Sequence, residues 1–431
     1  MKRSALNAFR KTLAGIDIPA AIERRLDRAG SAIRAGDATL DLRGFGTILS
    51  ISYGKASLAM AQGLVRALGP EFPVEGILVA PAPGWVMPGW QTFVGGHPIP
   101  DAGSFAAGRA ILDRLARCDE KTLVIFLISG GGSAMVEQPL DPAISLRDFQ
   151  ALFRALVTCG APIEEISVVR KHLSATKGGR LAGAAARSMK VTLAISDVPL
   201  GEESALASGP TLPDPSTVLD AERLADSYGL LGKLPPSLRA IFENHRLRET
   251  PKEGDPAFAR SHFVRLLSVH DLFHAAHHAC EEEGFICICD DASDGWPIER
   301  AADHLLAQLA VLKAANPRHR VAVLADGEVS SPVTGDGIGG RNSAFVLACV
   351  PKIAGKDIAV LSAGTDGIDG NSPAAGAVAD GETLARARNA GLSVEDFARR
   401  SDAYTFFERL GDAIVTGPTG NNLRDLRILM A

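Results

Sequence analysis

Short runs of apolar, β-prone residues alternate with longer segments of helical periodicity along most of the 431-residue chain. This alternation is typical of βαβ units, in which a helix carries the chain back to the next parallel strand. It therefore predicts the α/β class, with parallel sheets and helices on both faces. The predicted strands are residues 47–52, 74–80, 121–129, 190–196, 264–269, 320–325 and 357–364, and the predicted helices include residues 56–68, 102–118, 270–284 and 299–316.

A polar, proline-rich stretch at residues 234–258 interrupts this alternation and has no signal for a buried strand. Domain boundaries commonly fall in such segments, and the length of the chain suits two domains of ordinary size. We therefore expect one domain over residues 1–250 and a second over residues 251–431.

The composition argues against several classes of function. A net charge of -5 and an aromatic content of 5% provide neither a basic surface nor stacking platforms for nucleic acid. The longest apolar run, residues 123–128, is too short to cross a bilayer, and the charged N-terminus does not resemble a secretory signal. The six cysteines are scattered along a long chain, which is typical of reduced thiols and not of a disulfide framework. We expect a cytoplasmic protein that binds neither membrane nor nucleic acid.

Two predicted strand-to-helix loops have the character of anion sites. In 52-SYGKAS-57, Gly54 and Lys55 follow a strand and precede a helix, and in 126-FLISGGGSAM-135 the residues Ser129, Gly130, Gly131, Gly132 and Ser133 do the same. Ligands of open parallel sheets bind at such loops, and consecutive glycine N–H groups can surround phosphate oxygens. The alternatives are a solvated lysine and a tight turn. Neither loop matches the dinucleotide fingerprint or the Walker A motif.

Further candidates lie in other loops of the first half. His97 is held in 95-GGHPIPD-101, Lys171 and Lys177 belong to the basic segment 170–180, and Asp197 follows a predicted strand. The lysines could bind a carboxylate or a phosphate, although a solvated basic helix face is the commoner explanation. Asp197 could be a magnesium ligand or a turn residue.

Glycine-rich loops also occur in the second half. The segment 335-GDGIGGRNSAF-345 carries Arg341 and Asn342, and 364-GTDGIDG-370 carries Asp366 and Asp369. An arginine at the start of a helix suits the charge that develops on a transferring phosphoryl group. The alternative for the two aspartates is a pair of turn residues.

Taken in order, the motifs SYGKAS, GGHPIPD, SGGGSAM, LSATKGGRLA, ISDVPLG, GGRN, GTDGIDG and the last segment 404–429 resemble those of the class II glycerate kinases. The resemblance covers nearly the whole chain. It implies ATP-dependent phosphorylation of D-glycerate with Mg²⁺, generally at the 2-hydroxyl. It also implies a larger N-terminal Rossmann-like three-layer domain and a smaller C-terminal α/β domain, with the active site in the cleft between them.

The resemblance assigns catalytic roles to Lys55 and Arg341. For such a reaction we expect the triple-glycine loop to hold a phosphate or the carboxylate of glycerate. Lys171 or Lys177 would hold the substrate carboxylate, and Asp197 would act as a base or, with Asp366, as a metal ligand. The chain departs from the family where Ser343 and Ala344 replace the usual Q-E and where Pro373 replaces an aspartate.

Two other functions stay open. Some members of the family bear the name hydroxypyruvate reductase, from tartrate degradation, so an NAD(P)H-dependent reductase is one alternative. A non-catalytic protein that binds a small anion is the other. The sequence is compatible with a monomer or a homodimer.

Overall fold

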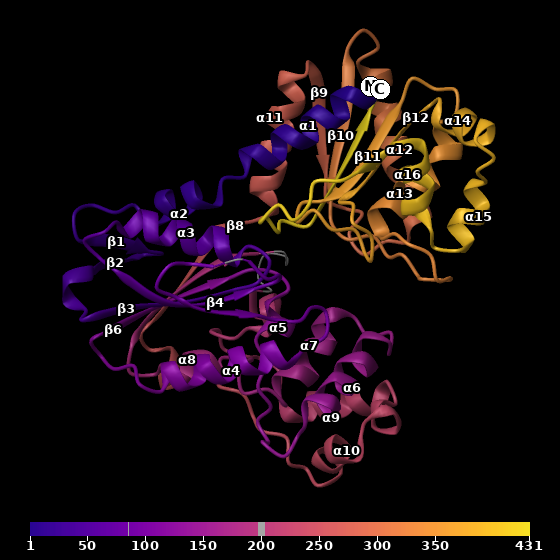
Figure 1. Ribbon diagram of the computed structural model, residues 1–431. Helices are drawn as coiled ribbons and strands as arrows, with labels where there is room; N and C mark the ends of the chain where they lie inside the picture. The colour runs from indigo at the N-terminus through magenta and orange to yellow at the C-terminus, as the bar shows by residue number, and fades with distance from the viewer. Residues whose placement is uncertain (85, 197–202) are drawn as a thin grey trace. The chain divides into compact units, whose positions relative to one another are not determined.

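The computed structural model describes residues 1–84, 86–196 and 203–431, and it divides into two compact units (Figure 1). The parallel-sheet unit comprises Ile18–Leu267, and the mixed-sheet unit comprises Met1–Asp17 together with Ser268–Ala431. The chain therefore passes between the units at residues 17–18 and 267–268 instead of once near residue 250, and the first 17 residues belong with the C-terminal half.

The difference has a physical cause in the proline-rich stretch at 234–258. That stretch contains a short helix, Pro236–Glu243, whose Leu238, Ile241 and Phe242 are buried in a hydrophobic cluster of the parallel-sheet unit. The strand that follows, Ser261–Leu267, pairs with the sheet of the same unit. The polar composition of this stretch therefore did not indicate that one face of its helix is apolar and buried. The parallel-sheet unit continues through this strand and ends at Leu267.

The parallel-sheet unit is built on six parallel strands in the order β5-β4-β3-β6-β7-β8. The chain moves outward from β3 to β4 and β5, returns to place β6 on the other side of β3, and then moves outward to β7 and β8. The winding direction therefore reverses between β3 and β6, the point at which open α/β sheets bind their ligands. The strands are β3 Thr47–Tyr53, β4 Val74–Ala80, β5 Gln91–Val94, β6 Thr122–Ile128, β7 Met189–Ile195 and β8 Ser261–Leu267.

Helices cover this sheet, and every residue of β6 is buried, as expected for a central strand covered on both faces. A group of four helices, α6, α7, α9 and α10, packs around a hydrophobic cluster of its own, and we call it the helical cluster (Figure 1). The unit also has a small hairpin, β1 Ala32–Ala35 and β2 Ala38–Asp41. Its helices are α2 Ile18–Leu26, α3 Ser57–Leu68, α4 Ala102–Leu115, α5 Gly132–Met135, α6 Leu146–Val157, α7 Ile163–Lys171, α8 Arg180–Ala184, α9 Val218–Ser227 and α10 Pro236–Glu243.

The mixed-sheet unit has six strands in the order β13-β12-β11-β14-β10-β9. Only β9 and β10 are parallel neighbours, so the expectation of parallel sheets is confirmed in the first unit and is wrong in the second. Two strands are responsible: β14 lies between β10 and β11 and runs antiparallel to both, and β12 lies between β11 and β13 and runs antiparallel to both. The strands are β9 Phe285–Asp290, β10 Arg320–Asp326, β11 Ala359–Gly364, β12 Gly376–Asp380, β13 Ala413–Ile414 and β14 Asp425–Met430.

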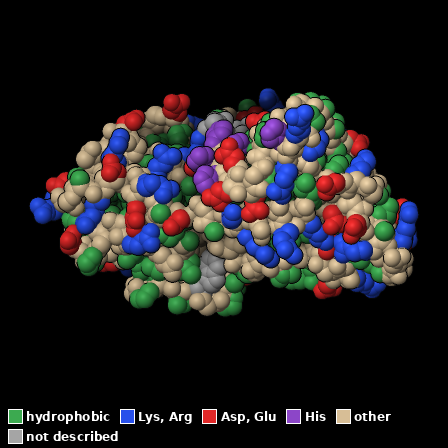
Figure 2. All heavy atoms as spheres, turned by 90° about the horizontal axis from the view of Figure 1, so that it is seen from above, with side chains coloured by type: hydrophobic (Ala, Val, Ile, Leu, Met, Phe, Trp, Pro, Cys, Tyr) green, Lys and Arg blue, Asp and Glu red, His purple; other side chains and the backbone are tan. Residues whose placement is uncertain are grey.

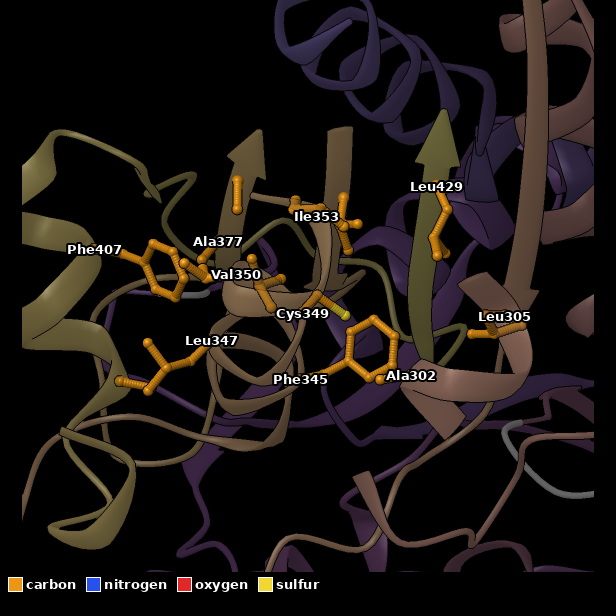
Figure 3. Packing of buried hydrophobic residues seen from close by; sticks show 14 of the residues in the cluster. Ala302, Leu305, Phe345, Leu347, Cys349, Val350, Ile353, Ala377, Phe407 and Leu429 are labelled. Carbon is orange, nitrogen blue, oxygen red and sulfur yellow. The ribbon is translucent and has the colours of Figure 1, made fainter. Parts of the chain in front are cut away.

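The core of this unit is organised around helix α13, whose apolar face packs against α12, α16 and the sheet (Figure 3). Phe345, Val350 and Ile353 on α13 are fully buried, with Leu429 of β14 among their neighbours in the cluster. This packing fixes the start of α13, Arg341, relative to the sheet edge. The helices are α1 Lys2–Gly15, α11 Val269–Glu282, α12 Ile298–Ala315, α13 Arg341–Ile353, α14 Thr383–Asn389, α15 Val394–Arg399 and α16 Ala403–Leu410.

On the face shown in Figure 2, Lys and Arg side chains are interspersed with Asp and Glu, so this face has no stripe of one sign. Among the described residues, no helix combines the length and the apolar character that crossing a bilayer requires. All six cysteines are free thiols.

The N-terminal helix α1 belongs structurally to the mixed-sheet unit, because it packs against α11, β11, β12 and β14. Phe9 is fully buried there. We expect Phe9→Ala to lower the free energy of unfolding of this unit by about 3–5 kcal/mol through the cavity it leaves. Hydrogen exchange should show faster exchange in β11, β12 and β14 and unchanged exchange in β3, β6 and β7.

The exposed Arg10 on the same helix provides the control, since Arg10→Ala removes a side chain outside the core. Equal loss of protection in both sheets, or none in β11, would contradict the placement of α1.

Candidate active site

The two anion-binding loops predicted in the first half lie side by side at the switch point of the parallel sheet. Because β3 and β6 are parallel neighbours, the loops that follow them leave from the same edge. The backbone N–H of Lys55 donates to the carbonyl of Gly130 at 3.0 Å, and the N–H of Ala56 donates to Ser129 Oγ at 3.0 Å. The fold therefore fixes the position of Lys55 relative to the triple-glycine loop.

Gly54 makes this contact possible. Its φ of +109° lies in a region that residues with a side chain rarely adopt, and a Cβ at this position would overlap the carbonyl and hydroxyl oxygens of Ser129. A substitution here would therefore strain the backbone and push the two loops apart.

The triple-glycine loop faces Lys55 and His97. A Cβ built on Gly131, whose φ is +81°, would lie 3.2 Å from His97 Cδ2 and 3.3 Å from Lys55 Cγ. Within the described part of the chain, the N–H groups of Gly130 and Gly131 donate to no backbone carbonyl. Two backbone donors, an ammonium side chain and an imidazole thus occur together, which is a suitable set for binding oxyanions.

The two flanking serines and Gly132 support this loop. Ser129 is buried, and its hydroxyl is the acceptor for Ala56 N–H. Ser133 Oγ lies 2.9 Å from Ser208 Oγ. A Cβ on Gly132 would lie 2.8 Å from the ring of Tyr53, so this glycine permits close packing of the loop on β3. The glycines therefore allow the loop to pack closely on β3, and they also leave its N–H groups unobstructed by side chains.

Lys171 and Lys177, predicted to bind a substrate carboxylate, each form a buried ion pair with a carboxylate of the protein. Lys177 Nζ lies 2.8 Å from Glu137 Oε2, and these side chains are 1% and 0% exposed. Lys171 Nζ lies 3.0 Å from Asp214 Oδ1, with side chains 5% and 1% exposed. Burial lowers the pKa of Lys177. Both cations are already paired with carboxylates inside the unit, and they tie residues 171–177 to their surroundings.

In the mixed-sheet unit, Arg341 is the first residue of α13, as the sequence predicts. Its Nε lies 2.5 Å from Asp425 Oδ2, and its Nη1 lies 2.7 Å from Glu328 Oε2. Burial acts to lower the pKa of Arg341, but the charges of Asp425 and Glu328 outweigh it and raise the pKa. The side chain is still 35% exposed. Arg341 is thus an oriented, permanently charged group that keeps an accessible part.

Asn342 and Asp369 hold the start of α13. Asp369 accepts hydrogen bonds from the N–H groups of Asn342 and Ser343, both at 2.9 Å, and from Ser343 Oγ at 2.6 Å. Asn342 is buried, and its Oδ1 accepts from Ser362 Oγ at 2.6 Å. Ser343, which stands where the family usually has glutamine, therefore donates its hydroxyl to the carboxylate that caps the helix. The buried side chain of Asn342 contributes to holding the start of α13 against β11.

Of the two predicted metal ligands, only Asp366 is among the described residues. Asp197 lies outside the described residues. Asp366 Oδ1 accepts from the N–H of Ile368 at 2.9 Å, as an aspartate in a turn does. Among the described residues, no three His, Cys, Asp or Glu side chains form a group that could hold a metal ion.

Sequence reasoning missed a network of charges beside Arg341. Asp326 ends β10 and Asp425 begins β14, and the antiparallel register brings both to one sheet edge. Arg424 Nη2 lies 2.5 Å from Asp294 Oδ2, and its Nη1 lies 3.4 Å from Asp326 Oδ2. Arg427 is fully buried and donates to the carbonyl of Asp326. One signal was available, since Asp326 directly follows the predicted strand 320–325.

Burial raises the pKa of Asp326 to about 6, despite the opposing charges of Arg424 and Arg427. Well below pH 3.8, the ordinary pKa of an aspartate, the carboxyl is neutral in the folded and unfolded chains; between pH 3.8 and about 6 it is ionised mainly in the unfolded chain. The free energy of unfolding should therefore fall as the pH rises through this window, by about 3 kcal/mol relative to Asp326→Asn. Urea unfolding of both proteins at pH 4 and pH 7 measures this, and a pH-independent difference would contradict it.

The buried Lys177–Glu137 pair gives a second prediction. Lys177→Met leaves Glu137 buried without its cation, so we expect a loss of about 3–5 kcal/mol in the free energy of unfolding. The double variant with Glu137→Leu should recover much of this loss. The exposed Lys121 provides the control as Lys121→Met. A fully stable Lys177→Met protein with impaired ligand binding would instead favour the binding role.

Comparison with known proteins agrees with this geometry. Residues 4–243 match the family described as a domain of unknown function (DUF4147), and residues 321–425 match the MOFRL family. A protein of Agrobacterium vitis with the provisional name hydroxypyruvate reductase is 36% identical, over 89% of this chain and 87% of its own. The D-glycerate 2-kinase of Thermotoga maritima is 32% identical, over 92% of this chain and 93% of its own.

A solved structure covers the whole chain. The crystal structure of glycerate kinase from Thermotoga maritima superposes with a TM-score of 0.82 at 29% identity, and the match covers 100% of this chain and 99% of that one. The order of the motifs, both family matches and the shared fold agree. The chain therefore belongs to the class II glycerate kinase family.

Proposed function

We propose that this protein transfers the γ-phosphoryl group of ATP to D-glycerate, with Mg²⁺, to give 2-phosphoglycerate and ADP. The observation that carries the proposal is the meeting of Lys55, His97 and the triple-glycine loop at the switch point of the parallel sheet. This set of donors suits oxyanions, and both substrates are oxyanions. A relative that is 32% identical is named D-glycerate 2-kinase.

In the proposed reaction, the 2-hydroxyl oxygen of glycerate forms a bond to the γ-phosphorus. The bond from that phosphorus to the bridging oxygen breaks, its electron pair stays with ADP, and the hydroxyl proton leaves to a base. Lys55 would neutralise charge on the phosphoryl oxygens, and the N–H groups of Gly130 and Gly131 would hold a phosphate or the glycerate carboxylate. Asp197 remains the candidate base from the sequence.

Arg341 is proposed to act on the same phosphoryl oxygens. Its orientation by Asp425 and Glu328 exists before substrate binds, so little reorganisation is needed at the moment of transfer. A guanidinium also keeps its charge at every physiological pH. Arg341 is therefore suited to stabilise the developing charge rather than to move a proton.

Mg²⁺, when bound, would neutralise the phosphate oxygens of ATP. Magnesium is usually held by one or two carboxylates together with substrate phosphates, so the lack of a three-residue metal group among the described residues is compatible with this use. The carboxylates that the sequence offers for it are Asp197 and Asp366.

The alternative function, an NAD(P)H-dependent reductase, is supported by the name of one relative. It requires a binding site for a dinucleotide. The loops after β3 and β6 read SYGKAS and SGGGSAM, and neither supplies the G-x-G-x-x-G spacing that brings a helix start to a pyrophosphate. Oxidation of NADH by hydroxypyruvate in the absence of ATP would establish the reductase instead.

The catalytic assignments can be tested with Lys55→Ala and Arg341→Ala. Each removes one cation from the transferring group, so kcat for ADP formation from ATP and D-glycerate should fall on the order of 100-fold or more. The exposed Lys121 and Arg318 provide controls, because their alanine variants remove the same charges elsewhere and should keep full activity. Full activity of either Lys55→Ala or Arg341→Ala would refute the role of that residue.

A further inference from the structure

Two thiols meet where helix α11 is followed by strand β9, at one edge of the mixed sheet (Figure 1). Cys280 lies in the last turn of α11, and Cys287 is the third residue of β9. Only two residues, Glu283 and Gly284, connect the two elements, and Gly284 has a φ of +81°. The connection therefore turns the chain back sharply, and α11 packs against β9.

The side chains of Cys280 and Cys287 meet within this packing. Ile288 packs against the hydrophobic cluster around α13, and none of the residues of α11, all of which are described, belongs to that cluster. Because successive residues of a strand point to opposite faces, Cys287 points away from α13, toward the face that α11 covers. The thiols of Cys280 and Cys287 are in hydrogen-bond contact there. Two cysteines in such contact need little movement of the backbone to form a disulfide.

The two thiols differ in exposure and in acidity. Cys280 is fully buried, whereas Cys287 is half-buried. The hydrogen bond from the Cys280 thiol stabilises a thiolate at Cys287 and lowers its pKa, while the same hydrogen bond and burial raise the pKa of Cys280. Cys287 is therefore the thiol that ionises first and the one that a small oxidant reaches from solvent.

Cys289 is a neighbouring thiol, but it does not fit as a partner of Cys287. It is exposed and lies two residues further along β9, on the same face. Residues two apart in a strand are about 6.6 Å apart, and their side chains stand side by side. A disulfide needs Cβ atoms about 3.8 Å apart, so bridging Cys287 and Cys289 would distort the strand.

We propose that Cys280 and Cys287 form a reversible disulfide when a peroxide oxidises this protein. The Cys287 thiolate forms a bond to a peroxide oxygen, the O–O bond breaks, and the leaving oxygen takes up a proton, which leaves a sulfenic acid on Cys287. The sulfur of Cys280 then forms a bond to that sulfur, the S–O bond breaks, and the hydroxyl leaves as water with the Cys280 proton. With hydrogen peroxide, the two thiols lose two hydrogen atoms and two water molecules form.

The test uses the full-length protein, hydrogen peroxide, and iodoacetamide, which alkylates free thiols in urea. The reduced protein should take up six alkyl groups, one for each cysteine, and the oxidised protein two fewer, with all six restored by dithiothreitol. Digestion after glutamate separates Cys280 from Cys287, because residues 281–283 are all glutamates. We therefore expect a linked pair of peptides that dithiothreitol separates.

Variants identify the two partners. Cys280→Ser, in a protein whose circular dichroism shows that it is folded, should leave a sulfenic acid on Cys287 that reacts with dimedone. Cys287→Ser should lose both the disulfide and the dimedone adduct at residue 287. Cys289→Ser is the matched control, since it removes the exposed neighbouring thiol and should form the Cys280–Cys287 link as before.

Several results would overturn the proposal. Six reactive thiols after peroxide treatment of the unchanged protein would do so, as would a link that contains Cys289 or a disulfide that persists in Cys287→Ser. A sulfenic acid on Cys287 that persists in the unchanged protein without forming the disulfide would also overturn it. None of these results depends on kinase activity.

Discussion

The close approach of Gly54 to Ser129, at the carboxyl ends of β3 and β6, is the contact on which the proposed site depends. The backbone at Gly54 has a positive φ and leaves no room for a Cβ beside the oxygens of Ser129. The hydrogen bonds from Lys55 and Ala56 to the glycine loop follow from this approach. The fold therefore fixes the position of a cation relative to a row of backbone donors before any substrate arrives, which is the property that electrostatic catalysis requires.

In the mixed-sheet unit, charge pairing has the corresponding role. Arg341 lies between two carboxylates, and the start of its helix is capped by Asp369. An arginine held in this way gives up part of its attraction for a ligand, but it also has fewer conformations to lose on binding. Burial of the charged side chains of Asp326, Asp425 and Arg427 nearby costs desolvation free energy and raises the pKa of Asp326. Ionisable groups with shifted pKa values concentrate in functional sites, so this cluster favours a functional site here.

Periodicity and loop placement predicted much of this structure. All seven strand predictions are confirmed, because short apolar runs bounded by glycine or polar residues correspond to buried strands. The sequence also predicted that Lys55 and the triple-glycine loop each follow the carboxyl end of a strand, but that β3 and β6 are neighbours, which brings the two loops together, is known only from the structure. The start of α13 at Arg341 was predicted from its glycine-rich loop.

Other features depend on tertiary partners that no local pattern records. The pairing of Arg341 with Asp425 spans 84 residues and exists because the last strand inserts antiparallel between β10 and β11. The burial of Lys171 and Lys177 depends on Asp214 and Glu137, which come from distant segments. The assignment of the first 17 residues to the C-terminal half likewise depends on the packing of α1.

The central claim, that the protein phosphorylates glycerate at its 2-hydroxyl, is tested most directly by the phosphorus NMR spectrum of the product formed from ATP and D-glycerate. The account predicts a new phosphoester resonance that is coupled to the single proton on carbon 2, together with stoichiometric ADP. A phosphoester coupled to the two protons of carbon 3, or no phosphoester at all in a protein that oxidises NADH with hydroxypyruvate, would contradict it.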